Sequence, residues 1–134
     1  MGTNYHHSSH SKYLIKLHFV IAVKYRKPLL KEDFKNDLLQ IIYDTAKENN
    51  YIISTMQSDI DHLHILIDIK PTVSAKEVIH KIKQISTFRI YKKYRSLLKK
   101  YFWKNNILWS RGYFVCSTGD VSTKTIKKYI NEQG

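Results

Sequence analysis

The sequence DHLHILIDI, residues 61–69, predicts a β-strand around which the rest of the chain is organised. Side chains alternate between the two faces of a strand, so residues two apart share a face and lie roughly 6.5–7 Å from each other. One face is wholly aliphatic and therefore belongs in a core: Leu63, Ile65 and Ile67. The other face carries His62 and His64, and two imidazoles on one face can converge on a divalent metal ion. Two unrelated histidines on a solvated face would give the same pattern.

Length and composition indicate one globular domain. Of the 134 residues, 43% are apolar, and we expect a single domain at residues 12–134 after a disordered N-terminal tail at residues 1–11. No apolar run approaches the roughly 20 residues of a membrane span, and the N-terminus lacks the apolar region of a signal peptide. Cys116 is the only cysteine, which excludes a disulfide framework and a thiolate zinc cluster and favours an intracellular, reducing location.

The charge balance favours a polyanionic partner. Lys and Arg total 23 against 11 Asp and Glu, which gives a net charge of +12 and a pI near 9.7. A basic domain of this size usually meets nucleic acid. The basic residues cluster after the first strand and between residues 76 and 104, and we expect DNA contacts from Lys24, Arg26, Lys27, Lys83, Arg89 and Lys93. Four nearby aromatic residues either stack unpaired bases or pack against the core edge: Tyr101, Phe102, Trp103 and Trp109.

Hydrophobic periodicity predicts a succession of strands and helices. We expect strands at residues 12–23, 51–57, 61–69 and 113–117, helices at residues 31–50 and from 74 to about 94 or beyond, and a last helix reaching residue 133. In the first strand, His18 projects from the more polar face, as His62 and His64 do in the third. The apolar stripe of the first helix is Phe34, Leu38, Ile41 or Ile42, and Ala46, and that of the second is Val78, Ile82, Ile85 and Phe88.

The order β-α-β-β-α-β-α predicts an α+β fold. Its first six elements are those of a ferredoxin-like or RNA-recognition-type domain, an antiparallel sheet with both helices on one face. The first and third strands then lie side by side at the centre, and the histidine pair faces away from the two helices. The last helix is the natural element to cross that open face. It carries Tyr129 and Gln133, which are four residues apart and so share one helical face.

Four segments together resemble one family. DHLHILI, LHFVIAVKYRKPLL, LWSRGYFVCST and KTIKKYINEQ are similar to segments of the small single-tyrosine HUH transposases of bacterial insertion sequences, the TnpA type of the 200/605-like elements. The resemblance runs from about Leu17 to the C-terminus. The histidine–hydrophobe–histidine triplet is short, but its combination with a Tyr-x-x-x-Gln on a final helix is much more specific.

The resemblance implies a function and a set of roles. His62, His64 and Gln133 match metal ligands of the family, and Tyr129 matches the nucleophile. The family implies cutting and rejoining of single-stranded DNA beside hairpins at the element ends, by homodimers in which the last helix of one subunit completes the site of the other. It also implies a bacterial, cytoplasmic protein that is nucleoid-associated when bound to DNA. Relatives often continue beyond the position of Gly134, so we expect weaker docking of the last helix.

The implied chemistry is transesterification by a tyrosine. Attack of its hydroxyl on a phosphodiester leaves a 5′-phosphotyrosine and a free 3′-OH, and the reverse attack rejoins strands. A tyrosine with a pKa of about 10 is a poor nucleophile at neutral pH, and a cation on the phosphate offsets this by neutralising charge. Two imidazoles and one amide oxygen suit Mg²⁺ or Mn²⁺, whereas a closed zinc site needs four protein ligands.

Three other functions fit parts of the sequence. A related HUH endonuclease with a host role in processing repetitive palindromic DNA would carry identical catalytic residues. A non-catalytic RNA-recognition-type module would expose aromatic residues on its central strands, where this chain has His18, His62 and His64 instead. A zinc hydrolase would need a general base, and Asp61 and Asp68 are the nearby carboxylates.

Overall fold

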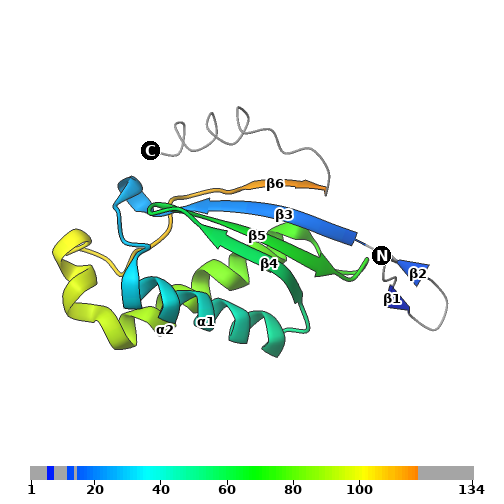
Figure 1. Cartoon of the computed structure of the whole chain (residues 1–134), viewed down its shortest axis with the longest axis horizontal. Coiled ribbons are helices and arrows are strands. Elements are labelled where there is room, and N and C mark those ends of the chain that lie inside the picture. Colours follow the sequence, from blue (N-terminus) through cyan, green and yellow to red (C-terminus); the bar gives the residue numbers. More distant parts are fainter. Residues whose placement is uncertain (1–5, 8–11, 14, 118–134) are drawn as a thin grey trace.

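The computed structural model describes residues 6–7, 12–13 and 15–117 of the chain. A four-stranded antiparallel sheet has helices α1 and α2 on one of its faces (Figure 1). Its elements, in chain order, are β3 (Ile15–Ala22), the short 3₁₀ helix η1 (Lys24–Arg26), α1 (Glu32–Glu48), β4 (Ile52–Ser58), β5 (His62–Ile69), α2 (Ala75–Tyr101) and β6 (Phe114–Ser117).

Two short strands precede the sheet. The pair β1 (His6–His7) and β2 (Lys12–Tyr13) is antiparallel and forms a separate two-stranded ladder. The other residues of the predicted N-terminal tail lie outside the described part, and the domain boundary at residue 12 stays a prediction. The predicted last helix also lies outside the described residues.

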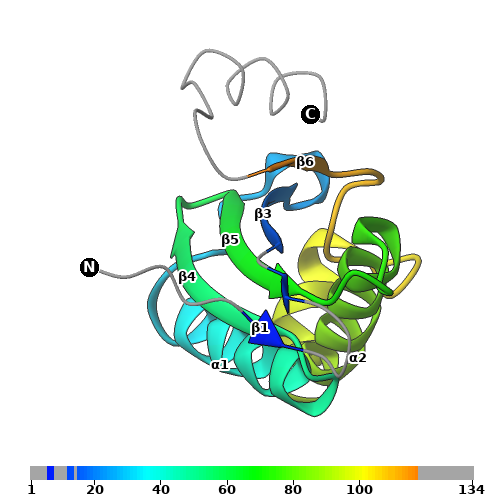
Figure 2. The ribbon, with the colours of Figure 1, turned by 90° about the vertical axis from the view of Figure 1, so that its right-hand side faces the viewer.

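The strand order β4–β5–β3–β6 confirms the predicted fold. The first and third of the predicted strands, β3 and β5, pair along their whole length at the centre, with Phe19 opposite Ile65. β4 and β6 form the two edges. Viewed from the side of the molecule, the curved sheet covers both helices (Figure 2). One sheet face is therefore packed against helices, and the other is the face on which the sequence predicted the histidines.

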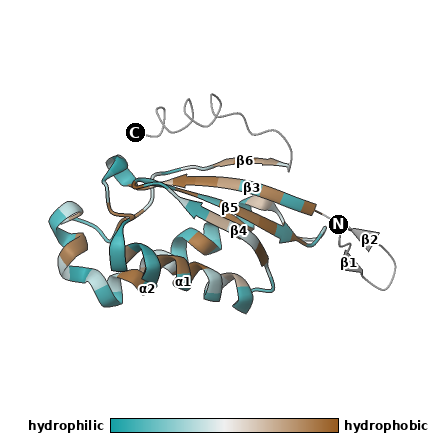
Figure 3. Ribbon diagram, viewed as in Figure 1, coloured by the Kyte–Doolittle hydropathy of each residue, from teal (hydrophilic) through white to brown (hydrophobic). Residues whose placement is uncertain are grey.

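The core lies between the sheet and the helices. Leu63, Ile65 and Ile67 of β5 are fully buried there, as their alternation predicted. The stripe of α1 is also confirmed, with buried Phe34, Leu38, Ile42 and Ala46. Hydrophobic residues fill most of β3 and β5, whereas both helices alternate between hydrophobic and hydrophilic residues along their length (Figure 3). This is the pattern of helices that bury one side only.

Helix α2 begins as predicted. The Ser74 side chain accepts a hydrogen bond of 3.1 Å from the backbone N–H of Glu77, which satisfies one free donor of the first turn. The helix continues beyond residue 94, as the prediction allowed, and ends at Tyr101, although Tyr94 departs from helical geometry with φ −123° and ψ 31°. In the part of the chain that the structure describes, no helix is both long enough and apolar enough to cross a membrane.

One member of the predicted stripe of α2 is wrong. Val78 and Ile82 are buried, and the stripe continues through Ser86 and Ile90. Phe88 is 63% exposed. It lies two residues from both Ser86 and Ile90, and two residues turn an α-helix by about 200°, so Phe88 points away from the core.

Candidate active site

Three histidines meet on the face of the sheet that points away from α1 and α2, which we call the histidine face. His18 comes from β3, and His62 and His64 come from β5, its central neighbour in Figure 1. The ring centroids of His62 and His64 are 5.1 Å apart, and those of His18 and His64 are 5.2 Å apart. The predicted pair therefore exists as a pair of adjacent rings, with a third imidazole beside it.

The ring of His62 is held by a carboxylate. Its Nδ1 lies 2.9 Å from Oδ1 of Asp61, and the other oxygen of Asp61 accepts a hydrogen bond of 3.2 Å from Nε of Arg26. An ionised carboxylate only accepts, so the proton of the neutral ring is on Nδ1 and the lone pair is on Nε2. This is the usual arrangement for a histidine that binds a metal through Nε2. The exposed carboxylate of Asp59 is 3.5 Å from that Nε2.

The ring of His64 is held by another imidazole. Its Nδ1 lies 3.1 Å from Nε2 of His18. Directly opposite His64 and His62 in the sheet are Val20 and Ala22, both buried, so the cross-strand neighbours of the two rings are apolar. Burial, and to a lesser degree the charges of His62 and His18, lower the pKa of His64 to about 4. Burial also lowers the pKa of His18. His64 is therefore neutral at pH 7, as a metal ligand must be.

The donor set suits a metal site that is incomplete within these residues. Among the described residues, no group of three histidine, cysteine or carboxylate side chains is arranged to hold a metal ion. The described strands thus supply two imidazole nitrogens, which on their own would leave the other positions of a bound metal ion open. The predicted third ligand Gln133 and the predicted nucleophile Tyr129 lie outside the described residues and stay predictions.

The first predicted DNA-binding cluster lies beside this face. Lys24 and Arg26 are in η1, and Lys27 follows it. Arg26 binds the carboxylate of Asp61, which in turn holds the ring of His62. The sequence placed Arg26 in a basic patch, but its contact with the turn before β5 depends on tertiary structure.

The second predicted cluster, on α2, is engaged within the protein. Nζ of Lys83 donates to the backbone oxygens of Ser110 and Gly112, at 2.7 and 2.8 Å, and burial lowers its pKa.

Arg89 and Lys93 bind acidic residues of α1. Arg89 makes two hydrogen bonds to the carboxylate of Glu48, at 2.6 and 3.1 Å, and Nζ of Lys93 lies 2.7 Å from Asp37. These contacts lower the pKa of both carboxyls below the ordinary values. Both charges therefore tie α2 to α1.

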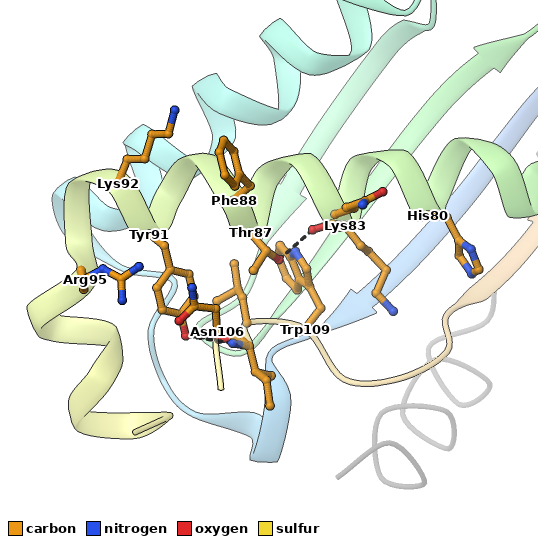
Figure 4. A pocket seen from close by; sticks show the side chains of 12 residues that line it. His80, Lys83, Thr87, Phe88, Tyr91, Lys92, Arg95, Asn106 and Trp109 are labelled. Carbon is orange, nitrogen blue, oxygen red and sulfur yellow. Dashed lines mark hydrogen bonds between the residues drawn. The ribbon is translucent and has the colours of Figure 1, made fainter. Parts of the chain in front are cut away.

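A different side of α2 carries a basic, aromatic pocket that sequence reasoning missed. The α2 pocket has a volume of about 880 Å³ and lies between the helix and the segment before β6 (Figure 4). Among the described residues, no acidic one lines it: the lining residues are His80, Lys83, Gln84, Thr87, Phe88, Tyr91, Lys92, Arg95, Asn106, Ile107, Leu108 and Trp109.

Aromatic and cationic groups stand next to each other in this pocket. Nζ of Lys92 is 4.5 Å from the ring centroid of Phe88, and the guanidinium of Arg95 is 5.9 Å from that of Tyr91. The signal in the sequence was the spacing of Phe88, Lys92 and Arg95, four and then three residues apart, which places them on one helical face.

The predicted aromatic segment divides between core and surface. Phe102 and Trp109 are buried, and the indole N–H of Trp109 donates to Ser86 Oγ at 3.0 Å. Trp103 is exposed. Packing therefore accounts for Phe102, whereas Trp109 also lines the α2 pocket.

Comparison of the sequence with known proteins gives one consistent result. The family model described as "Transposase IS200 like" matches residues 11–133. The chain is 29% identical over 121 residues to the ISDra2 transposase TnpA of Deinococcus radiodurans, covering 90% of this chain and 85% of that protein. It is also 29% identical over 125 residues to the transposase for insertion sequence element IS200 of Salmonella typhimurium, covering 93% and 80%.

Two solved structures share the fold. A provisionally identified transposase from Deinococcus radiodurans superposes with a TM-score of 0.87 at 23% identity, covering 96% of this chain and 97% of that one. A REP-associated tyrosine transposase bound to a REP hairpin gives a TM-score of 0.57 at 13% identity, covering 93% and 69%.

Proposed function

Because the chain belongs to the family of IS200-like transposases, we propose that it cuts and rejoins single-stranded DNA at the ends of an insertion sequence. The observation that carries the proposal is the pair His62 and His64 on one face of β5, with both Nδ1 atoms held by neighbours. With the proton of each ring on Nδ1, both Nε2 atoms would be available to a metal ion, which is the requirement for metal-assisted phosphoryl chemistry.

The proposed metal is Mg²⁺ or Mn²⁺. His62 and His64 would hold it through Nε2, with the amide oxygen of Gln133 as third ligand. When bound, it supplies charge neutralisation at the scissile phosphate. Asp61 keeps the proton of His62 on Nδ1, and Arg26 orients the carboxylate of Asp61. Imidazole and oxygen ligands without thiolate fit these metals together with open positions for phosphate and water.

The proposed nucleophile is Tyr129. Its phenolic oxygen would attack the phosphorus, and the bond from phosphorus to the 3′ oxygen would break. The phenolic proton is lost and the leaving 3′ oxygen gains one, so the products are a 5′-phosphotyrosine and a free 3′-OH. Attack by a second 3′-OH would reverse these steps and join strands without another energy source.

We also propose that DNA contacts the α2 pocket, in place of Arg89 and Lys93, two of the helix residues expected from sequence. Lys92 and Arg95 present cations there, and Phe88 presents an exposed ring that can stack on an unpaired base. The side of the helix that contacts α1 is less suited, because Arg89 and Lys93 are paired with Glu48 and Asp37. The REP-associated relative is bound to a hairpin, and we propose hairpin DNA as the ligand here. A homodimer that shares its last helices is part of the same proposal.

The histidine face argues against a non-catalytic RNA-recognition-type module. Such a module stacks bases on aromatic side chains of its central strands. On the corresponding face of β3 and β5, the structure has His18, His62 and His64. The rings of His62 and His64 are each held through Nδ1 by a neighbouring side chain, which favours metal binding over base stacking.

The test is formation of a covalent adduct. The protein is incubated with Mn²⁺ or Mg²⁺ and single-stranded DNA carrying the flanks of its own gene, and the products are separated on a denaturing gel. We expect a shifted band that is abolished by EDTA, by Tyr129→Phe and by His64→Ala. Tyr43→Phe, at an exposed tyrosine of α1, is the matched control and should keep the band. An adduct that survives Tyr129→Phe would refute the nucleophile, and one that survives His64→Ala would refute the metal site.

A further inference from the structure

We propose that His18 is a positioning residue that sets the proton of His64 on Nδ1 and so makes its Nε2 available to the metal ion. The inference rests on the proposed metal-dependent function. It concerns a residue that is neither a proposed ligand nor a proposed nucleophile, and it follows from one contact, the 3.1 Å between Nε2 of His18 and Nδ1 of His64.

The contact admits two arrangements of one proton. Either His64 donates from Nδ1 to Nε2 of His18, or His18 donates from Nε2 to Nδ1 of His64. A neutral imidazole carries one proton, so the first arrangement leaves the lone pair of His64 on Nε2 and the second leaves it on Nδ1, where His18 occupies it. Only the first arrangement lets His64 bind a metal through Nε2.

The neighbouring ligand shows the same design with a different acceptor. His62 directs its Nδ1 to Asp61 at 2.9 Å, and a carboxylate fixes the donor direction because it carries no proton at neutral pH. In the proposed arrangement His18 accepts a hydrogen bond from Nδ1 of His64, just as Asp61 accepts one from Nδ1 of His62. The difference is that His18 is a neutral acceptor supplied by the adjacent strand, whose register places it diagonally across from His64.

A neutral acceptor suits this position. The rings lie beside buried Val20 and Ala22, where an additional unpaired charge would be costly. Asp61, by contrast, is balanced by Arg26 at 3.2 Å. A histidine at position 18 therefore orients His64 without adding a second carboxylate that would need its own cation.

The experiment measures the tautomer and the affinity for Mn²⁺ separately. Long-range ¹H–¹⁵N NMR of the metal-free protein reports which nitrogen of His64 carries the proton, and electron paramagnetic resonance follows a titration with Mn²⁺ alone. The variants are His18→Leu, which removes the acceptor, and His18→Gln, whose side-chain oxygen can replace Nε2. Cys116→Ala is the matched control, because Cys116 lies opposite His18 in the sheet on β6.

We expect the Nδ1–H tautomer of His64 in the unaltered protein and its loss in His18→Leu. Removal of a residue that orients a metal ligand typically weakens metal binding 10–100-fold, and we expect a weakening of about this size in His18→Leu. His18→Gln should restore most of the affinity, and Cys116→Ala should keep all of it. Thermal unfolding of each variant shows that the fold is retained, and His18→Gln keeps the test valid if the leucine variant does not fold.

Two results would overturn the inference. One is a His64 proton on Nε2 in the unaltered metal-free protein, which is decisive whether or not Mn²⁺ binds. The other is Mn²⁺ binding with three coupled imidazoles, which would make His18 a ligand. Absence of Mn²⁺ binding in the unaltered protein, with the Nδ1–H tautomer present, would instead refute the proposed metal site and leave the orientation of His64 as inferred.

Discussion

The two sides of α2 allow a test in which the same charge is removed from neighbouring positions. Lys92→Gln with Arg95→Gln removes two cations from the α2 pocket, and Arg89→Gln with Lys93→Gln removes two cations that are paired with Glu48 and Asp37. Both double variants lower the net charge by two, so any long-range effect of total charge is the same in each. A difference between them therefore reports local contact with DNA.

The magnitude follows from counterion release. Each phosphate contact to single-stranded DNA contributes about 0.7 to the slope of log affinity against log salt concentration. Removing two phosphate contacts from the α2 pocket should lower that slope by about 1.4. Removing the paired cations should leave the slope unchanged. Exposed ion pairs contribute little to stability, so the variant without the pairs to α1 should remain folded.

Phe88→Ala separates stacking from charge. A base stacked on an aromatic ring contributes about 1–3 kcal/mol, which corresponds to a decrease of roughly 5–150-fold in affinity for single-stranded DNA with no change of the salt slope. Fluorescence anisotropy with a labelled oligonucleotide at several salt concentrations measures both quantities. Equal slopes for the two double variants, or a larger change in the Arg89 and Lys93 variant, would refute the assignment of the α2 pocket.

Two further predictions concern the fold and the titration of the site. Ile65→Ala should lower the free energy of unfolding by about 2–5 kcal/mol, because Ile65 is fully buried between the sheet and the helices. Ile52 lies on the edge strand β4 with half its surface exposed, so Ile52→Ala should lower the free energy of unfolding far less. Urea denaturation measures both values, and equal decreases would contradict the described core. The pKa of His64 is about 4 in the folded chain and ordinarily about 6.5, so between these pH values the unfolded chain binds a proton that the folded chain excludes. The stability of the metal-free protein should therefore fall as pH falls from about 6.5 toward 4. Above a pH of about 6.5 the stability should not depend on this group. His64→Gln should show a smaller fall over that range in chemical denaturation, and an identical pH dependence would show that His64 is not buried as a neutral ring.

The sheet and its central histidines were predictable because they follow from local alternation. The period of two in residues 61–69 separates the aliphatic face from the face of His62 and His64, and the same period in β3 places His18 on the matching face. The alternation does not set the register between strands. The sequence therefore showed that His18 shares the face, but not that its Nε2 lies 3.1 Å from His64.

The local sequence could not show which basic residues of α2 are engaged with other parts of the protein. Lys92 and Lys93 count equally as basic residues in the sequence. Only the packing of α2 against α1 brings Asp37 next to Lys93. Lys83 is a similar case, since its backbone acceptors come from a segment 27 and 29 residues further along the chain. Phe88 was assigned to the apolar stripe because it is hydrophobic and three residues from Ile85. The buried stripe continues through Ser86 instead, so Phe88 lies outside it.

His62 and His64 lie on a strand that is paired on both sides, and this pairing determines how constant the relative position of the two rings is. β5 is bonded to β4 along one edge and to β3 along the other, so it cannot open locally without breaking two ladders at once. Such interior strands exchange their amide hydrogens only in openings that approach global unfolding. The two proposed metal ligands should therefore keep their relative position as long as the domain is folded, and control of the proposed activity would fall to the groups that come to them from elsewhere.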